Sequence, residues 1–269
     1  MKKNLLLIVA LFVATSMSAQ FYAGLGLGYG LGASKRVLGT EVSGTNNVIE
    51  KNNYGSYGQG MNTTLKLGFM FNDNMGIEFD ASYLLGATQT IDKSTDYLME
   101  AKSNGLRIMP QLVYKLDNGF YGRFGMIIPV MGKTVRTEKH DKFQVGPTTY
   151  VVKETEMESR GEFSIGFAGA IGYSFELSDN MSLFGEIEYI GLSIKSGEAE
   201  VTKFELDNKD QLANLKTGQI EYIFLDEVDN SSDNTPSNPN YDLDKPTALL
   251  GQRAPFSSIG LNVGITMSF

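Results

Sequence analysis

Apolar and polar residues alternate along eight segments of the chain. In each segment, apolar side chains take every second position, and polar residues or glycines take the positions between them. Because consecutive side chains of a β-strand point to opposite faces, this alternation predicts strands with one apolar and one polar face. The predicted strands are Phe21–Gly32, Thr64–Phe71, Ile77–Leu85, Leu106–Leu116, Phe120–Val130, Glu162–Leu177, Leu183–Tyr189 and Ser258–Phe269.

The connections between these strands alternate in length. Three are minimal turns of residues that tolerate tight hairpin backbones, at Asn72–Asn74, Asp117–Gly119 and Ser178–Asn180. The other four are long and polar, at about 34–58, 89–103, 133–157 and 196–252. Short turns at one end and long loops at the other are typical of membrane barrels. The sequence therefore predicts an all-β fold, an eight-stranded antiparallel transmembrane up-and-down β-barrel.

The charged residues of the predicted strands lie on the face opposite the apolar residues. In a membrane barrel the apolar face contacts lipid, so these charges are expected inside the lumen; a soluble sheet whose charges face water is the alternative. Glycines from Gly24 to Gly32 form one bare face of the first strand, which would make room for long charged side chains. The expected lumen charge cluster is Lys66, Glu78, Asp80, Arg107, Lys115, Arg123, Glu162, Glu186 and Glu188.

Unpaired charges would be costly in so narrow an interior. The four cations and five anions are therefore expected to form a salt-bridged plug, with a gate that rearranges to pass small solutes as the alternative. Aromatic residues near the strand ends suit the two membrane interfaces. They are Phe69, Phe71, Phe120, Phe175 and Phe269 beside the short turns, and Tyr83 and Tyr189 towards the long loops.

The first residues have the pattern of a secretory signal peptide. Lys2 and Lys3 precede an apolar run from Leu5 to Ala14, and small residues follow up to Ala19. Cleavage after Ala19 is expected, which divides the chain into a signal peptide, 1–19, and a barrel domain, 20–269. The apolar run is too short to span a bilayer as a helix.

Composition removes several kinds of chemistry. The chain has Cys 0 and His 1, which excludes disulfides, thiolate metal sites, a cysteine nucleophile and paired-histidine zinc sites. Its formal net charge of −8 disfavours a nucleic-acid partner. We expect no catalytic residues, no cofactor and no metal site. His140, beside Asp141, is interpreted as a solvated loop residue.

Three segments carry a resemblance to a known family: Phe71–Gly86, Leu177–Gly191 and the last strand, Ile259–Phe269. The chain resembles small outer-membrane barrels of the OmpA transmembrane domain, OmpX and OmpW type. The resemblance implies a bacterial outer-membrane location and contact with outer-membrane lipid and lipopolysaccharide. It also implies insertion by the barrel-assembly machinery, which would read an assembly signal at Leu261, Val263, Ile265, Met267 and Phe269.

The last long loop is the most acidic part of the chain. Between 196 and 252 it holds twelve Asp and Glu against four Lys, a net charge of −8. Specific metal binding is not expected, although loose association of cations fits this composition. The alternating segments 201–206 and 219–225 leave open a ten-stranded barrel.

The function expected from these patterns is non-enzymatic. A structural or surface-interaction role through the long extracellular loops, with an extracellular ligand, is favoured for a monomeric protein. The alternative is a narrow porin or transporter for small or apolar solutes.

Overall fold

The computed structural model describes residues 20–44 and 48–269. The predicted signal peptide, 1–19, lies outside the described residues. The described chain is almost entirely β-structure, and none of its helices is long and apolar enough to cross a membrane.

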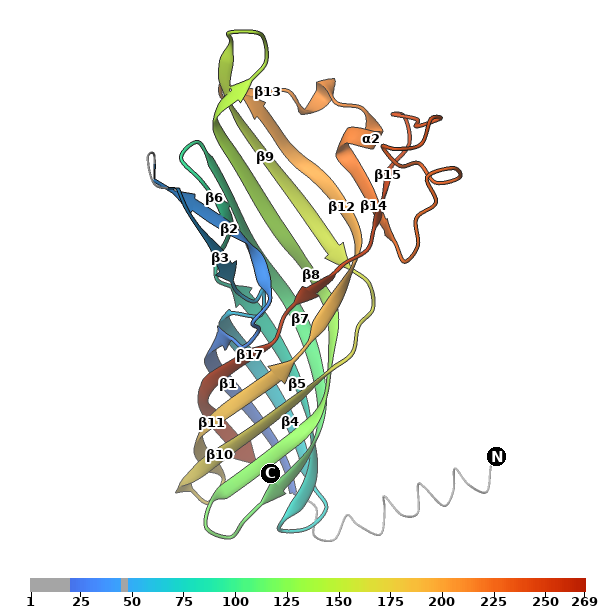
Figure 1. The fold of residues 1–269 in the computed structure, drawn as a ribbon. Coiled ribbons are helices and arrows are strands. Elements are labelled where there is room, and N and C mark those ends of the chain that lie inside the picture. Colours follow the sequence, from blue (N-terminus) through green and yellow to red (C-terminus); the bar gives the residue numbers. More distant parts are fainter. Residues whose placement is uncertain (1–19, 45–47) are drawn as a thin grey trace, which may run out of the picture.

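Eight strands form a closed antiparallel barrel (Figure 1). Each pairs with the next in the order of the chain, and the last pairs with the first, from Tyr22 opposite Ser268 to Gly32 opposite Ser258. The predicted eight-stranded barrel is therefore confirmed. Its strands are β1 (Gln20–Gly32), β4 (Gly60–Met70), β5 (Met75–Gly86), β7 (Tyr97–Lys115), β8 (Phe120–Gln144), β10 (Gly166–Ser178), β11 (Met181–Gly191) and β17 (Ser258–Ser268).

The three predicted tight turns join strands at one end of the barrel. At the first turn, the side-chain oxygen of Asn72 accepts the backbone N–H groups of Asn74 and Met75, at 3.0 and 2.8 Å. At the second turn, Gly119 has a φ of 90°, a conformation that glycine adopts without steric cost. These local bonds fix the hairpin register, and hence which side chains face the interior.

The apolar face points outward, as predicted. Leu25 on β1 is 58% exposed, whereas Arg123 on β8 is 4% exposed. Aromatic rings cluster on the outer face at the short-turn end. They include Phe21 against Phe69 at 5.5 Å, Phe69 against Phe71 at 5.6 Å and Phe120 against Tyr173 at 4.9 Å between ring centroids.

The bare glycine face of β1 accommodates different side chains from those predicted. A Cβ on Gly26 would lie 3.1 Å from the ring of Phe184, and one on Gly28 would lie 2.8 Å from the side-chain carbon Cγ of Asn262. The space beside β1 is thus filled by an inward-facing aromatic ring and an amide. Lys66 borders this space, 4.8 Å from the centroid of the Phe184 ring.

The four predicted long loops contain a tall β-extension above the barrel (Figure 1). Strands β7 and β8 continue past the barrel, β8 then pairs with β9, β9 with β12 and β12 with β14. The additional strands are β2 (Val37–Ser43), β3 (Ile49–Tyr54), β6 (Gln89–Lys93), β9 (Tyr150–Gly161), β12 (Ser193–Leu206), β13 (Lys209–Asp210), β14 (Glu221–Leu225), β15 (Thr247–Leu250) and β16 (Arg253–Pro255). Two short helices, η2 (Leu212–Asn214) and α2 (Thr217–Ile220), accompany them.

This extension excludes the ten-stranded alternative. The segments 201–206 and 219–225 contribute to β12 and β14, which belong to the extension. Barrel closure runs directly from β11 to β17, between Met181 opposite Met267 and Ile190 opposite Ser258.

Candidate functional site

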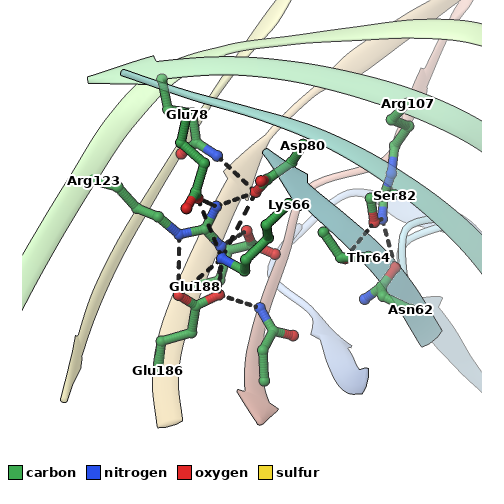
Figure 2. Close-up of polar contacts among 12 residues, drawn as sticks. Asn62, Thr64, Lys66, Glu78, Asp80, Ser82, Arg107, Arg123, Glu186 and Glu188 are labelled. Carbon is green, nitrogen blue, oxygen red and sulfur yellow. Dashed lines mark hydrogen bonds and ion pairs between the residues drawn. The ribbon is translucent and has the colours of Figure 1, made fainter. Parts of the chain in front are cut away.

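Six of the nine predicted lumen charges meet inside the barrel (Figure 2). Arg123 on β8 lies at the centre and pairs with Glu78 at 3.2 Å, with Glu188 at 2.8 Å, and with Asp80 and Glu186. Lys66 on β4 pairs with three of the same carboxylates, at 3.3 to 3.8 Å. The cluster therefore links β4, β5, β8 and β11 across the interior.

Neutral side chains add hydrogen bonds to this ion cluster. The hydroxyl of Tyr22 donates to Glu78, and that of Tyr121 donates to Glu186, each at 2.8 Å. Asn262 donates its amide to Glu186 at 3.1 Å. Buried carboxylates are costly unless their oxygens are paired or hydrogen-bonded, and four carboxylates face only two cations here. Among the described residues, Oδ1 of Asp80 is buried without a hydrogen-bond partner.

The other three predicted lumen charges lie elsewhere. Arg107 is buried in a separate layer, where its Nη2 donates to Asn62 and Ser82. Lys115 lies over the ring of Tyr22, 4.5 Å from the ring centroid.

Glu162 differs most from the prediction, because it is exposed and pairs with Lys195 at 2.7 Å. The reason is that β9 ends at Gly161 and β10 begins only at Gly166. Between them the chain leaves the barrel wall, so the alternation of β10 does not extend back to this residue.

One side of the lumen is apolar, which the alternation of apolar and polar residues did not predict. The apolar lumen cluster consists of Met109, Ile127, Ala168, Ile190 and Leu192, all nearly inaccessible to solvent. Several of these residues stand directly beside an outward apolar residue. Consecutive apolar pairs, such as Ile127 and Ile128, are the signal in the sequence that could have indicated this side.

A cavity of about 1290 Å³ lies where the barrel meets the β-extension. Its apolar lining includes Leu84 from β5, Ile194 from β12, Phe224 from β14 and Phe256 from the segment before β17. Its charged lining is strongly basic, with Glu162 as the single acidic residue. The basic lining residues are Arg36, Arg107, Lys133, Arg136, Arg160, Lys195 and Arg253.

Four of these seven basic side chains form ion pairs. Lys133 pairs with Glu158, Arg136 with Glu138 at 3.3 Å, Arg160 with Glu198 at 3.4 Å and Lys195 with Glu162 at 2.7 Å. Among residues 20–44 and 48–269, Arg36, Arg107 and Arg253 form no ion pair, and Arg36 donates to the backbone carbonyl of Arg253. The cavity thus has unbalanced positive charge in a protein of net negative charge.

The barrel wall is incomplete beside this cavity. Strand β8 pairs with β10 only up to Ile127 opposite Gly166, and with β9 only from Thr134 opposite Ser159. The intervening residues 128–133 have no strand partner on that side. Pro129 lies in this interval, and its nitrogen has no N–H to offer a neighbouring strand. The interval is bordered by exposed apolar side chains, including Met131 and Phe163.

In the described part of the chain, no group of three or more His, Asp or Glu side chains is arranged to hold a metal ion. His140 stacks on Tyr97 at 4.4 Å, and Asp141 pairs with Lys139. Burial lowers the pKa of His140, and the nearby charge of Lys153 lowers it further.

The five residues of the predicted assembly signal all lie on β17 or directly after it. Their side chains are exposed on the outer face of the barrel. The backbone N–H of Phe269 donates to the carbonyl of Phe21 at 2.8 Å, which ties the last residue to the first barrel strand.

Comparison with known proteins points to one family. The family model described as outer membrane protein beta-barrel domain matches residues 5–221. No curated protein matches the chain.

Solved structures of bacterial outer-membrane and surface proteins match the chain at low sequence identity and low TM-score. Neisserial surface protein A is 10% identical with a TM-score of 0.35, over 93% of this chain and 97% of that one. OprG from Pseudomonas aeruginosa is 14% identical with a TM-score of 0.42, over 94% and 96%. The attachment invasion locus protein Ail of Yersinia pestis, solved in complex with the heparin analogue sucrose octasulfate, is 9% identical with a TM-score of 0.35, over 94% and 100%.

Proposed function

Because the chain belongs to the outer membrane protein beta-barrel domain family and lies in the bacterial outer membrane, we propose that it is a non-enzymatic binding protein of the cell surface. Its long extracellular segments build a chamber for a small molecule. One observation carries this proposal: the cavity of about 1290 Å³ lies beyond a lumen that is crossed by ion pairs. A ligand that enters the cavity from outside would meet a lumen closed by these ion pairs, and not an open channel.

The composition of the lining supports binding rather than catalysis. Small-molecule sites are mostly apolar with a few placed polar groups, and this lining combines apolar side chains with arginines. The only histidine of the protein stacks on Tyr97 in the β-extension, outside the lining. We further propose that the protein acts as a monomer, because one chain closes the barrel and builds the whole chamber.

The absence of tryptophan makes binding simple to measure. Phe224→Trp would place one fluorophore in the cavity lining, and Tyr150→Trp would place one on an exposed strand outside it. In lipid nanodiscs, 8-bromooctanol should quench the tryptophan fluorescence of the first variant saturably. It should quench that of the second variant only in proportion to the alcohol concentration. Equal, non-saturating quenching of both would refute a binding chamber.

Conductance tests whether the ion pairs close the lumen. In planar bilayers, the unmodified protein should show no steady openings. Sustained openings of the unmodified protein would show that the lumen conducts, and the porin function would then replace binding.

A second candidate function is the passage of apolar solutes from the chamber into the membrane. The interval 128–133, which lacks a partner strand beside the cavity, favours it. In proteoliposomes, Met131→Gln should slow the entry of an apolar solute. Met126→Gln, on the same exposed face of β8 but within the paired region, is the matched control. Equal rates for both variants and the unmodified protein would exclude this route.

A further inference from the structure

Arg107 is a buried cation without an anion. Its side chain is 3% exposed, and its Nη2 atom donates to Asn62 and, at 3.4 Å, to Ser82. Its Nε and Nη1 atoms are buried and donate to no acceptor. It forms no ion pair within the described ranges 20–44 and 48–269. Leaving donors of a buried charged group unpaired is costly, so this arrangement is stabilised when an anion supplies the missing acceptors.

The contrast with Arg123 shows how unusual this environment is. Arg123 is surrounded by four carboxylates, whereas Arg107, in the part of the chain that the structure describes, hydrogen-bonds only to neutral groups. Figure 2 shows Arg107 with Asn62, Ser82 and Thr64, apart from the ion cluster. In the register of β4 against β5, Asn62 lies farther toward the long loops than Lys66. Arg107 thus belongs to the layer that faces the cavity, and it lines that cavity.

The rest of the cavity reinforces the preference for an anion. Arg36 and Arg253 line it without carboxylate partners, and its one acidic residue, Glu162, is already paired with Lys195. A concave site with one sign of charge concentrates ligands of the opposite sign. This local positive field stands out in a chain with a net charge of −8.

Apolar side chains complete the recognition surface. Leu192 of the apolar lumen cluster lines the cavity, together with Ile194 and Phe256, which pack against that cluster. A wholly polar anion would leave this surface without a partner, and a wholly apolar molecule would leave Arg107 unpaired. We infer that the ligand is an anionic amphiphile, whose oxyanion headgroup accepts hydrogen bonds from Nε and Nη1 of Arg107 and whose apolar chain packs on these residues. This inference rests on the binding function proposed above.

Paired probes that differ only in charge test the inference. In nanodiscs of zwitterionic lipid and slightly alkaline buffer, 8-bromooctanoate and 8-bromooctanol would quench the Phe224→Trp protein. The carboxylate should bind about tenfold more tightly than the alcohol, the lower end of what charge-assisted hydrogen bonds contribute. Arg107→Gln, introduced into the Phe224→Trp protein, should abolish this difference by weakening the binding of the carboxylate alone. Lys203→Gln in the same protein should keep it, because Lys203 lies outside the lining and pairs with Glu154 at 2.8 Å.

The outcomes separate this inference from the proposed function. If both probes bind saturably with equal affinity, and Arg107→Gln changes neither, the anion site is wrong and the chamber stands. If neither probe saturates, the binding function itself fails. Folding of each variant is checked by heat-modifiable migration on gels. If Arg107→Gln does not fold, the ratio of the affinities for the two probes is measured on the protein with Arg107 and on Arg107→Lys. If the carboxylate and the alcohol bind with equal affinity to each of these two proteins, the inference is overturned.

Discussion

Arg123 on β8 and Glu78 on β5 form an ion pair at 3.2 Å, although β7 lies between their strands in the sheet. The pair therefore crosses the interior instead of following the wall. Arg123 also pairs with Glu186 on β11, beyond β10. A single guanidinium thus connects β8 to β5 and β11, two strands that are not its neighbours in the backbone ladder.

This geometry predicts that removing Arg123 strongly destabilises the barrel. Arg123→Gln leaves buried carboxylates without their main cation, and breaking such a buried network costs about 3–5 kcal/mol of unfolding free energy. Urea unfolding in lipid vesicles, followed by gel migration, measures the loss. Arg160→Gln is the control, because its exposed pair with Glu198 is expected to contribute at most about 1 kcal/mol. Equal stabilities of the two variants would contradict the central role of Arg123.

The glycine face of β1 gives a second stability test. A Cβ on Gly28 would lie 2.8 Å from the backbone oxygen of Leu261 and would overlap the side chain of Asn262. Gly28→Ala should therefore destabilise the barrel by about 1–3 kcal/mol, the usual cost of overpacking.

Gly185 on β11 supplies the matched control for this substitution. A Cβ there would have nothing within 4 Å. Gly185→Ala should be neutral or stabilise the barrel by about 0.4–1 kcal/mol, because alanine restricts the unfolded chain. A Gly28→Ala protein as stable as Gly185→Ala would show that β1 and β17 separate easily.

The barrel could be predicted from sequence because lipid and a polar interior impose a period of two on every strand. The alternation from Leu261 to Phe269 and the turn at Asn72 were therefore sufficient. The β-extension could not be predicted in this way. Strand β9, from Tyr150 to Gly161, is partly exposed along most of its length and has no apolar face. It forms a hairpin with β8, and its other edge pairs with β12, whose partner residues are distant in sequence.

The candidate site was predicted only in part, for a related reason. Alternation identifies which residues face inward, but not which of them meet. Arg107 and Arg123 have the same pattern in sequence, yet one lies among carboxylates and the other among neutral groups. The cavity depends on Phe224 and Ile194, which lie outside the eight predicted strands.

His140 provides a pH-dependent prediction, and as the only histidine it gives a single resolved NMR signal. Its pKa is lowered in the folded protein by burial and by Lys153. The unfolded chain then binds its proton more tightly, so the contribution of this site to stability is present above the ordinary histidine pKa of about 6.5 and declines below it.

Titration of the His140 ring signal measures this effect. Lys153→Gln should raise the pKa of His140, because it removes a nearby positive charge. Lys139→Gln is the control, since Lys139 is engaged with Asp141. A pKa of His140 at or above its ordinary value in the unmodified protein would contradict its packing against Tyr97.

The final residue predicts an effect on assembly rather than on ligand binding. Phe269 is 76% exposed, so its side chain contributes little to packing within the protein. If the last strand is read during insertion, Phe269→Ala should slow the appearance of the folded form in cells. Phe163→Ala, at a phenylalanine that is 74% exposed outside that strand, should not. Equal insertion rates for the two variants would exclude Phe269 from the assembly signal.

The last long segment can be removed without disturbing the barrel, because its two ends meet. The backbone N–H of Ser196 donates to the carbonyl of Gln252 at 2.9 Å, beside the short ladder of β12 and β16. Replacing 197–251 with an Asn-Gly turn, which suits a two-residue hairpin, should leave heat-modifiable migration unchanged. Since the replacement also removes Tyr222, Phe224 and Leu249 from the cavity lining, it should abolish saturable uptake of radiolabelled octanoate by the nanodiscs. A barrel that no longer folds would mean that the segment is needed to close the sheet, and unchanged octanoate binding would move the ligand site elsewhere.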